Sequence, residues 1–345
     1  MTSKVYITKT DKITPVKIKE ILKKSQFIKQ LKPDEKIAIK TNLLDVENKG
    51  FVSPKYMDKI IKLIESKNAK AELIDTNHIY HVENDTQYHY SNNIKQKIID
   101  DSKYMDIEID SKLLKKVIKS SEVDEYDKLI ILTKFKPHYL IGLEGAIKTT
   151  GVDLNVKSGK IELYKQAAPF ISKIGCLACK LCAQECPTKT ITINSIAEIN
   201  YAGCIACNYC IRVCPTDAIK PNRIKTDLLN QAIAEYMKTI TQNKDIIYIN
   251  ILNDIRADYE HTQIGNHKIV DDIGILMSQD PVALDQASYD IINQKPGNKS
   301  PELKTNYLPG EDKIAGLWRT IDAQQQLNIA EEEKLGTTQY ELIHI

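Results

Sequence analysis

The chain has 345 residues, 42% of them hydrophobic, and its 48 basic and 46 acidic side chains leave a formal net charge of +2. This balance gives no reason to expect nucleic acid as a partner, and a mean hydropathy of −0.34 argues against both disorder and a membrane protein. No apolar secretion core follows Met1, so we expect a cytoplasmic protein.

Strand and helix patterns alternate in the first half of the chain. Runs rich in β-branched residues predict strands over 3–9, 35–44, 69–77 and 127–133. Apolar residues at helical spacing predict a helix over 53–68, with Ser53 as its cap and Pro54 at its first position. The polar stretch 77–120 has no pattern that assigns a structure to it.

All eight cysteines fall between positions 176 and 214, in two copies of one motif. The copies read GCLACKLCAQECPTKTI and GCIACNYCIRVCPTDAI, are offset by 28 residues, and each follow the pattern C-x2-C-x2-C-x3-C-P. Three closely spaced thiolates can hold one face of a cuboidal iron–sulfur cluster, while the fourth cysteine, before proline, reaches the other cluster. The spacing therefore predicts two [4Fe–4S] clusters, one held by Cys176, Cys179, Cys182 and Cys214 and the other by Cys204, Cys207, Cys210 and Cys186.

Two other uses of these cysteines fit the motif less well. Tetrahedral zinc prefers two separated C-x2-C pairs, and disulfides need an oxidising compartment, for which there is no signal. Small residues beside the ligands, such as Gly175 and Ala178, would let backbone amides approach the sulfurs. The segment 170–222 resembles a bacterial-type two-cluster ferredoxin.

The α/β pattern resumes after the cysteines. Helices are predicted over 226–242, 281–293 and 321–336, and strands over 245–252 and 269–281. Gly336 is expected to end the last helix. We therefore expect an α/β sheet with covering helices, built from 1–169 and 223–345 and interrupted by an inserted two-cluster ferredoxin-like module over 170–222.

The α/β part is similar to the iron–sulfur proteins that carry the domain of unknown function 362. The resemblance rests on KIAIKTNLL at 36–44, ELIDTNHIY at 72–80, LIILTKFKPHYLIGLEGAIKTTG at 129–151 and VDDIGILMSQDPVALDQASYDII at 270–292. It covers most of the chain and implies a ferredoxin insert at the same place, but it names no reaction. The chain departs from the family's usual residues at Asn42, Pro137 and Thr149. IRADYEH at 255–261 also lacks the cysteines common there, so a third metal held by cysteine is not expected.

Polar residues follow several of the predicted strands, and ligands of open α/β sheets bind beyond the carboxyl ends of the strands. Lys40 and Asn42 follow one strand, Asp75 another, and Lys136 and His138 a third, with Gly142, Gly145 and Lys148 just beyond. Lysines among glycines suit a carboxylate or phosphate, a desolvated lysine can act as a base or Schiff-base nucleophile, and histidine carries protons near neutral pH. We expect Lys40, Lys136, His138 and Lys148 to be the catalytic residues of an anion-binding cleft.

Plainer interpretations compete with this cleft. Surface lysine is the default, and a lysine-rich chain places some near strand ends by chance. Asp280 and Asp285 fit the caps of a turn and a helix equally well. GLEGAIKTT does not meet the phosphate-loop pattern, and three histidines, His78, His81 and His89, are spaced too loosely to favour a metal over a solvated loop.

A simple electron carrier needs only the cysteine segment, so the rest of the chain implies another task. We expect electron transfer through the two clusters to or from the cleft, with a ferredoxin or an oxidoreductase as redox partner and a small anionic substrate. No GxGxxG fingerprint indicates a nicotinamide cofactor. The alternatives are a non-redox isomerase, lyase or ligase whose clusters are structural, and a maturation protein that delivers electrons or clusters to a partner enzyme.

Overall fold

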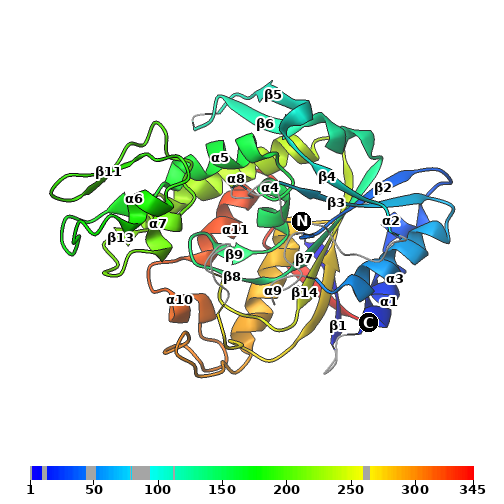
Figure 1. Ribbon diagram of the computed structural model, residues 1–345. Coiled ribbons are helices and arrows are strands. Elements are labelled where there is room, and N and C mark those ends of the chain that lie inside the picture. The colour runs from blue at the N-terminus through cyan, green and yellow to red at the C-terminus, as the bar shows by residue number, and fades with distance from the viewer. Residues whose placement is uncertain are drawn as a thin grey trace.

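The computed structural model describes residues 2–9, 14–43, 52–77, 79, 94–111, 113–258 and 265–345. An eight-stranded sheet runs through the middle of the protein, and helices cover both of its faces (Figure 1). Five of the seven strand pairs are parallel. The predicted α/β sheet with covering helices is confirmed. Within the described ranges, no helix has both the length and the apolarity needed to cross a membrane.

The sheet is assembled from both sides of the cysteine segment. Its strands are, in spatial order, β16 (Tyr340–His344), β1 (Ser3–Lys9), β15 (Gly274–Ser278), β14 (Asp245–Leu252), β7 (Lys128–Lys134), β2 (Lys36–Lys40), β3 (Lys70–Thr76) and β4 (Gln96–Ile99). β14 lies parallel to β7, with Asp245 opposite Lys128. The chain therefore leaves the sheet after β7 and returns to the neighbouring position in β14.

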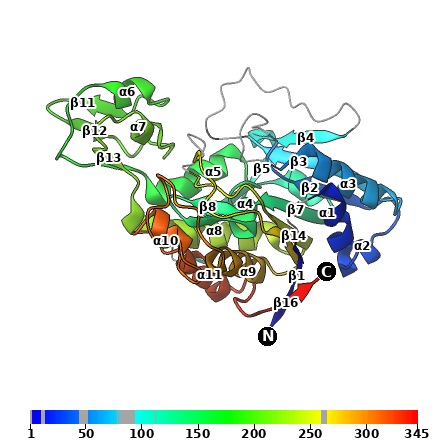
Figure 2. The ribbon, with the colours of Figure 1, turned by 90° about the horizontal axis from the view of Figure 1, so that it is seen from below.

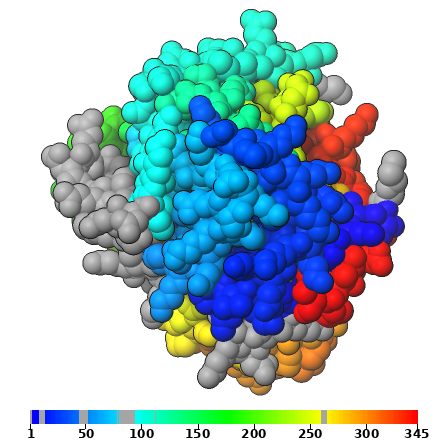
Figure 3. Space-filling view, turned by 90° about the vertical axis from the view of Figure 1, so that its right-hand side faces the viewer, coloured from blue at the N-terminus to red at the C-terminus, as the bar shows by residue number. Residues whose placement is uncertain are grey.

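Each face of the sheet buries its own hydrophobic core, because side chains alternate along a strand. The helices α1 (Pro15–Leu22), α2 (Gln26–Lys29) and α3 (Pro54–Glu65) cover one face, which Figure 3 views from outside. The helices α4 (Ala146–Gly151), α5 (Lys157–Tyr164), α8 (Thr226–Thr241), α9 (Pro281–Gln294) and α11 (Ala323–Glu332) lie on the other side. In β2, Ile37 and Ile39 join the first core and Ala38 joins the second. By the same alternation, the Lys40 side chain lies on the same face of the sheet as Ala38.

Several predicted boundaries need correction. The strand predicted over 35–44 ends at Lys40, and the one predicted over 269–281 is confined to β15. Helix α3 begins at Pro54, and Ser53 occupies the N-cap position, as predicted, but in the described structure the Ser53 side chain accepts no capping hydrogen bond. The unassigned stretch contains β4 and the hairpin β5 (Tyr104–Glu108)–β6 (Lys116–Ser120).

Gly336 does not end the last helix. α11 stops at Glu332, and Lys334 takes the left-handed conformation with φ 63°. Gly336 is needed for another reason, since a Cβ there would collide with the carboxylate of Asp280. That carboxylate caps α9 through the N–H groups of Val282 and Ala283, both at 2.9 Å, and it accepts from the Ser3 hydroxyl at 2.7 Å. Asp280 thus ties β1, α9 and the C-terminal segment together, and its interpretation as a cap is confirmed.

Residues 170–222 form a small unit that projects from the α/β body (Figure 2). Its elements are β10 (Phe170–Ile171), α6 (Leu181–Glu185), β11 (Ile191–Ile193), β12 (Ala197–Ile199), α7 (Tyr209–Arg212) and β13 (Ile219–Lys220). The backbone repeats with the sequence. Left-handed φ angles occur at Ala178, Lys180 and Lys189 and again 28 positions later at Ala206, Asn208 and Asp217. The two motif copies therefore form two copies of one loop.

Candidate functional site

The stretch that follows β7 folds back on itself at the carboxyl end of the sheet. The strands β8 (Lys136–His138) and β9 (Gly142–Glu144) form a hairpin with Lys136 opposite Glu144, and α4 begins directly after it. Gly142 adopts φ 92°, a conformation that favours glycine. The hairpin and the first turn of α4 bring Lys136, Glu144 and Lys148 together.

Glu144 lies between two lysines. The Lys136 ammonium is 3.5 Å from Glu144 Oε1 and 2.7 Å from Asp258 Oδ2. The Lys148 ammonium is 3.5 Å from Glu144 Oε2 and 3.0 Å from Asp153 Oδ2. Each of these five residues is at least nine-tenths buried. The predicted lysines do converge, but carboxylates of the chain itself occupy the positions of an anion.

Lys40 and Lys160 extend this group along the ends of β2 and β3. The Lys40 ammonium is 2.8 Å from Asp75 Oδ1, and both side chains are buried. Lys160, on α5, donates to Thr76 Oγ1 at 2.6 Å, and Thr76 Oγ1 donates to the Asp153 carbonyl at 2.7 Å. We call the eight residues the buried charged centre: Lys40, Lys136, Lys148, Lys160, Asp75, Glu144, Asp153 and Asp258. When all are ionised, four positive and four negative charges cancel.

Burial and neighbouring charges set the protonation of the centre. Burial raises the pKa of Asp153, but Lys148, and then Lys40 and Lys160, outweigh it and hold that pKa at about 2. Burial also raises the pKa of Glu144 above its ordinary value, with Lys136 and Lys148 opposing the shift. Burial lowers the pKa of Lys160 to about 8, which makes it the lysine of the centre that most readily gives up its proton near neutral pH.

The low pKa of Lys160 predicts a pH dependence of stability. Between about pH 8 and about pH 10.5 the unfolded chain binds more protons at this lysine than the folded chain, so the free energy of unfolding should rise with pH. Between about pH 7.5 and about pH 9.5, the free energy of unfolding of the wild type should rise by roughly 2 kcal/mol more than that of Lys160→Met. Urea unfolding under anaerobic conditions measures this difference. Parallel pH profiles for the two proteins would show that Lys160 titrates normally.

His138 supports the hairpin. Its Nδ1 accepts the backbone N–H groups of Leu140 and Ile141, both at 3.3 Å, so that nitrogen carries no proton in this arrangement. The backbones of His138 and Asp258 pair in an isolated parallel β-bridge. The ring is fully buried, which places His138 in the framework around Lys136 and Asp258.

The buried charged centre meets a small cavity and a surface depression. Glu144 lines a cavity of about 10 Å³ with Thr41, Asn42, Val52, Leu132, Thr133, Lys134 and Thr149. That volume has room for about one water molecule. Val52 and Lys134 also line a depression of about 280 Å³ with Ser53, Pro54, Tyr56, Ile251, Asn253 and Asp254. Lys134 therefore lies at the border of the two spaces. Burial lowers the pKa of Lys134, and Asp254 opposes this shift.

Sequence reasoning found three of the four lysines of the centre, Lys40, Lys136 and Lys148, but it missed Lys160 and most of the carboxylate partners. Glu144 and Asp153 lie four and five residues from Lys148, and Asp258 comes from a distant segment. Buried lysines are usually paired with carboxylates, and this is the signal that would have identified the two near partners. The three histidines of the loosely spaced group, His78, His81 and His89, lie outside the described residues.

The Asp285 side chain binds the N-terminus of α4. Its carboxylate accepts the N–H groups of Ala146 at 2.8 Å and Ile147 at 2.9 Å, and the Asn250 amide at 2.7 Å. A Cβ on Gly145 would collide with this carboxylate. The interpretation of Asp285 as a cap is confirmed, although it caps α4 rather than its own helix.

Four cysteines line a single cavity in the projecting unit. Cys186 comes from the first motif copy, and Cys204, Cys207 and Cys210 come from the second. Backbone N–H groups point at sulfur, from Thr190 to Cys186 at 3.4 Å and from Ala206 to Cys204 at 3.4 Å. Among the described side chains, none form a group of three or more that would hold a single metal ion. A [4Fe–4S] cluster binds each thiolate through a different iron, so this donor set fits a cluster.

The two halves of the projecting unit have different surroundings. Ala206, beside the cavity-lining cysteines, packs into the core of the α/β body. Around Cys176 and Cys179, in contrast, three apolar side chains face solvent: Ile174 (89% exposed), Leu177 (69%) and Leu181 (41%). We call these three residues the apolar patch.

The fold and the site define a class of α/β protein with a charged centre at the carboxyl ends of its strands and a cysteine repeat set into the chain. The family described as "Domain of unknown function (DUF362)" matches residues 37–290, and the chain belongs to this family. No curated protein sequence matches the chain.

Solved structures resemble the protein only distantly. A structural-genomics protein from Thermotoga maritima has 9% identity and a TM-score of 0.39, over 79% of this chain and 57% of that one. The lactate racemase apoprotein from Thermoanaerobacterium thermosaccharolyticum has 12% identity and a TM-score of 0.40, over 100% of this chain and 83% of that one. The chain thus spans little more than half of the Thermotoga protein, and likeness at this level carries no information on activity.

Proposed function

We propose that the protein transfers electrons through two [4Fe–4S] clusters held by residues 170–222, to or from a site at the carboxyl ends of the strands. The observation that carries the proposal is the cavity lined by Cys186, Cys204, Cys207 and Cys210, because it joins the two motif copies in the crossed manner that two-cluster ferredoxins use. A reducing compartment such as the cytoplasm would keep these thiols available as ligands.

The bound clusters would supply one-electron transfer at low potential. The chain's own residues would tune and protect them. N–H groups from Thr190, Ala197 and Ala206 donate to the sulfurs of Cys186, Cys176 and Cys204, and such bonds raise the potential of a cluster. The contact of Ala206 with the α/β core favours the cluster of Cys186 as the one closer to the strand-end site.

At that site, the depression beside Lys134 would receive a small anionic substrate. Glu144 acts as the internal counter-anion of Lys136 and Lys148, and its raised pKa eases protonation. Protonation of Glu144 would leave the balanced centre with one excess positive charge, which an entering carboxylate or phosphate could neutralise. The substrate would then be held by the electrostatic field and the shape of the site, to which Lys40, Lys136, His138 and Lys148 contribute.

The redox partner would dock at the apolar patch. Exposed Cys179 would hold one of the proposed clusters near this surface, and the exposed Lys173 and Lys180 flank it. Apolar contact with a basic rim suits a small acidic electron carrier, since transient redox complexes combine a small interface with charge steering.

A potentiometric EPR titration of anaerobically purified protein tests this function. We expect two reversible low-potential couples and rapid reduction by a reduced acidic ferredoxin. Leu177→Glu should keep both couples but slow that reduction about tenfold, whereas the matched change Leu308→Glu, an exposed leucine outside the unit, should not. Clusters that are present but not reversibly reducible would instead favour a non-redox enzyme, with Lys160 as the base in the strand-end site.

A further inference from the structure

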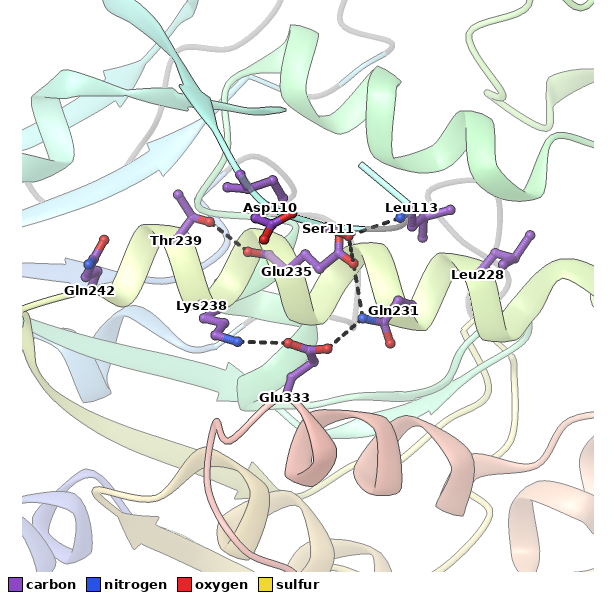
Figure 4. Close-up of a pocket in the computed structure, with 11 residues that line it drawn as sticks. Asp110, Ser111, Leu113, Leu228, Gln231, Glu235, Lys238, Thr239, Gln242 and Glu333 are labelled. Carbon is purple, nitrogen blue, oxygen red and sulfur yellow. Dashed lines mark hydrogen bonds and ion pairs between the residues drawn. The ribbon is translucent and has the colours of Figure 1, made fainter. Parts of the chain in front are cut away.

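A large groove lies along α8, apart from both the cysteines and the buried charged centre (Figure 4). It measures about 950 Å³, within the size range of small-molecule sites. Its lining comes from the segment between β5 and β6, from one side of α8 and from the end of α11: Ile109, Asp110, Ser111, Leu113, Leu228, Gln231, Glu235, Lys238, Thr239, Gln242 and Glu333. Three chain segments far apart in sequence thus build one concave surface.

The lining has an excess of negative charge. Among its described residues are three carboxylates, on Asp110, Glu235 and Glu333, and one ammonium, on Lys238. Lys238 is engaged, because its Nζ lies 3.0 Å from Glu333 Oε2. The Gln231 amide is engaged too, since it donates to Glu235 Oε1 at 3.1 Å and to Glu333 Oε1 at 2.9 Å (Figure 4). Both the Lys238 ammonium and the Gln231 amide therefore bind carboxylates of the groove, whereas Asp110 and Glu235 form no ion pair with any described residue.

Glu235 is the distinctive member of the groove. It is only 6% exposed, and its Oε1 accepts from both Ser111 and Gln231. No described residue donates a hydrogen bond to Glu235 Oε2, which is also shielded from solvent. A carboxylate oxygen held out of water without a donor is costly, so a donor that reached the Glu235 carboxylate would stabilise it.

We propose that this groove binds an aliphatic amine in its ammonium form. The ammonium would donate to Glu235, with Asp110 as the second negative charge at the rim. The alkyl chain would lie against Ile109, Leu113 and Leu228, of which Leu228 is 43% exposed in the protein as described. An ammonium group provides three donors and one positive charge, which matches a site with an excess of negative charge and a carboxylate oxygen that lacks a donor.

Isothermal titration of the anaerobically purified full chain with 1,5-diaminopentane tests the proposal, with 1-pentanol as the uncharged probe. We expect saturable binding of the diamine, weakened by salt, and none of the alcohol. Glu235→Gln should weaken the diamine about tenfold or more, because it removes the charge but keeps the shape and the acceptor for Ser111. Glu332→Gln, one residue from Glu333 but outside the lining, is the matched control and should bind as the wild type does.

Asp110→Asn provides a second variant at an exposed position, in case Glu235→Gln does not fold. It should also weaken the diamine and reduce the salt dependence. Equal affinities in the wild type and both folded variants, or no diamine binding at all, would overturn the proposal. Neither outcome depends on iron content or on electron transfer, so the test stands apart from the function proposed above.

Discussion

Replacing Cys186 by alanine is expected to halve the iron bound per chain, from about eight atoms to about four. Cys186 lies 18 residues before Cys204 in the sequence, yet it lines one cavity with Cys204, Cys207 and Cys210. Loss of one thiolate from such a set opens the cluster to solvent and to loss of its metal. Iron and sulfide analysis of the anaerobically purified protein, together with its EPR spectrum, measures the effect.

Two double variants separate the crossed arrangement from its alternative. If Cys186 and Cys207 hold the same cluster, Cys186→Ala with Cys207→Ala should retain as much iron as Cys186→Ala alone, about four atoms. Cys186→Ala with Cys179→Ala should then retain almost none. The reverse ranking would mean that each motif copy holds its own cluster, and it would contradict the crossed ligand sets.

Removing the charge of Lys148 is expected to destabilise the fold strongly. Lys148→Met should lower the free energy of unfolding by roughly 3–5 kcal/mol at neutral pH, because it leaves Asp153 and Glu144 buried without their shared cation. The Lys148 ammonium lies 3.0 Å from both Asp153 oxygens, and the side chain is 3% exposed. Urea unfolding under anaerobic conditions measures the change, with iron content as the check that the cysteine unit is intact.

The pH dependence and two further variants identify the cause. In the wild type the pKa of Asp153 is held at about 2, so its stabilising contribution persists until the pH falls towards that value. In Lys148→Met that pKa must rise, so the difference between the two proteins should narrow as the pH is lowered to about 4. Lys148→Met with Asp153→Asn should recover much of the loss. Lys116→Met, at an exposed ion pair with Asp106, should change stability little.

Helices and strands could be predicted where the sequence signal lies within a few neighbouring residues. β1 and β14 occupy the predicted positions, and α3 begins at Pro54, because alternation, helical spacing and an initial proline act within a few residues. β16 was not predicted, since its pairing with β1 depends on a segment more than 330 positions away. The Gly336 prediction failed for a similar reason, as the residue serves a contact with Asp280 and not a helix end.

The sequence predicted three lysines of the site, but it did not predict that carboxylates of the chain neutralise them. Ligands of open α/β sheets bind beyond the carboxyl ends of the strands, and this rule selected Lys40, Lys136 and Lys148. The structure places these three lysines in one centre. Their neutralisation by Asp75 and Asp258 follows from three-dimensional proximity that spacing along the chain does not reveal, whereas Asp153 lies only five residues from Lys148. The groove along α8 had no sequence signal at all, because its three walls come from segments without a shared motif.

The two chain connections between the projecting unit and the α/β body lie together, because β10 and β13 pair in an antiparallel ladder. Phe170 lies opposite Lys220 and Ile171 opposite Ile219, so the chain enters and leaves the unit side by side. Deletion of everything between these two short strands would leave ends that a tight turn could join, with every strand of the main sheet still in place. A gene for the α/β body could therefore gain or lose the cysteine unit in one event. If the unit transfers electrons as proposed, a swapped unit could connect the same body to a different electron donor.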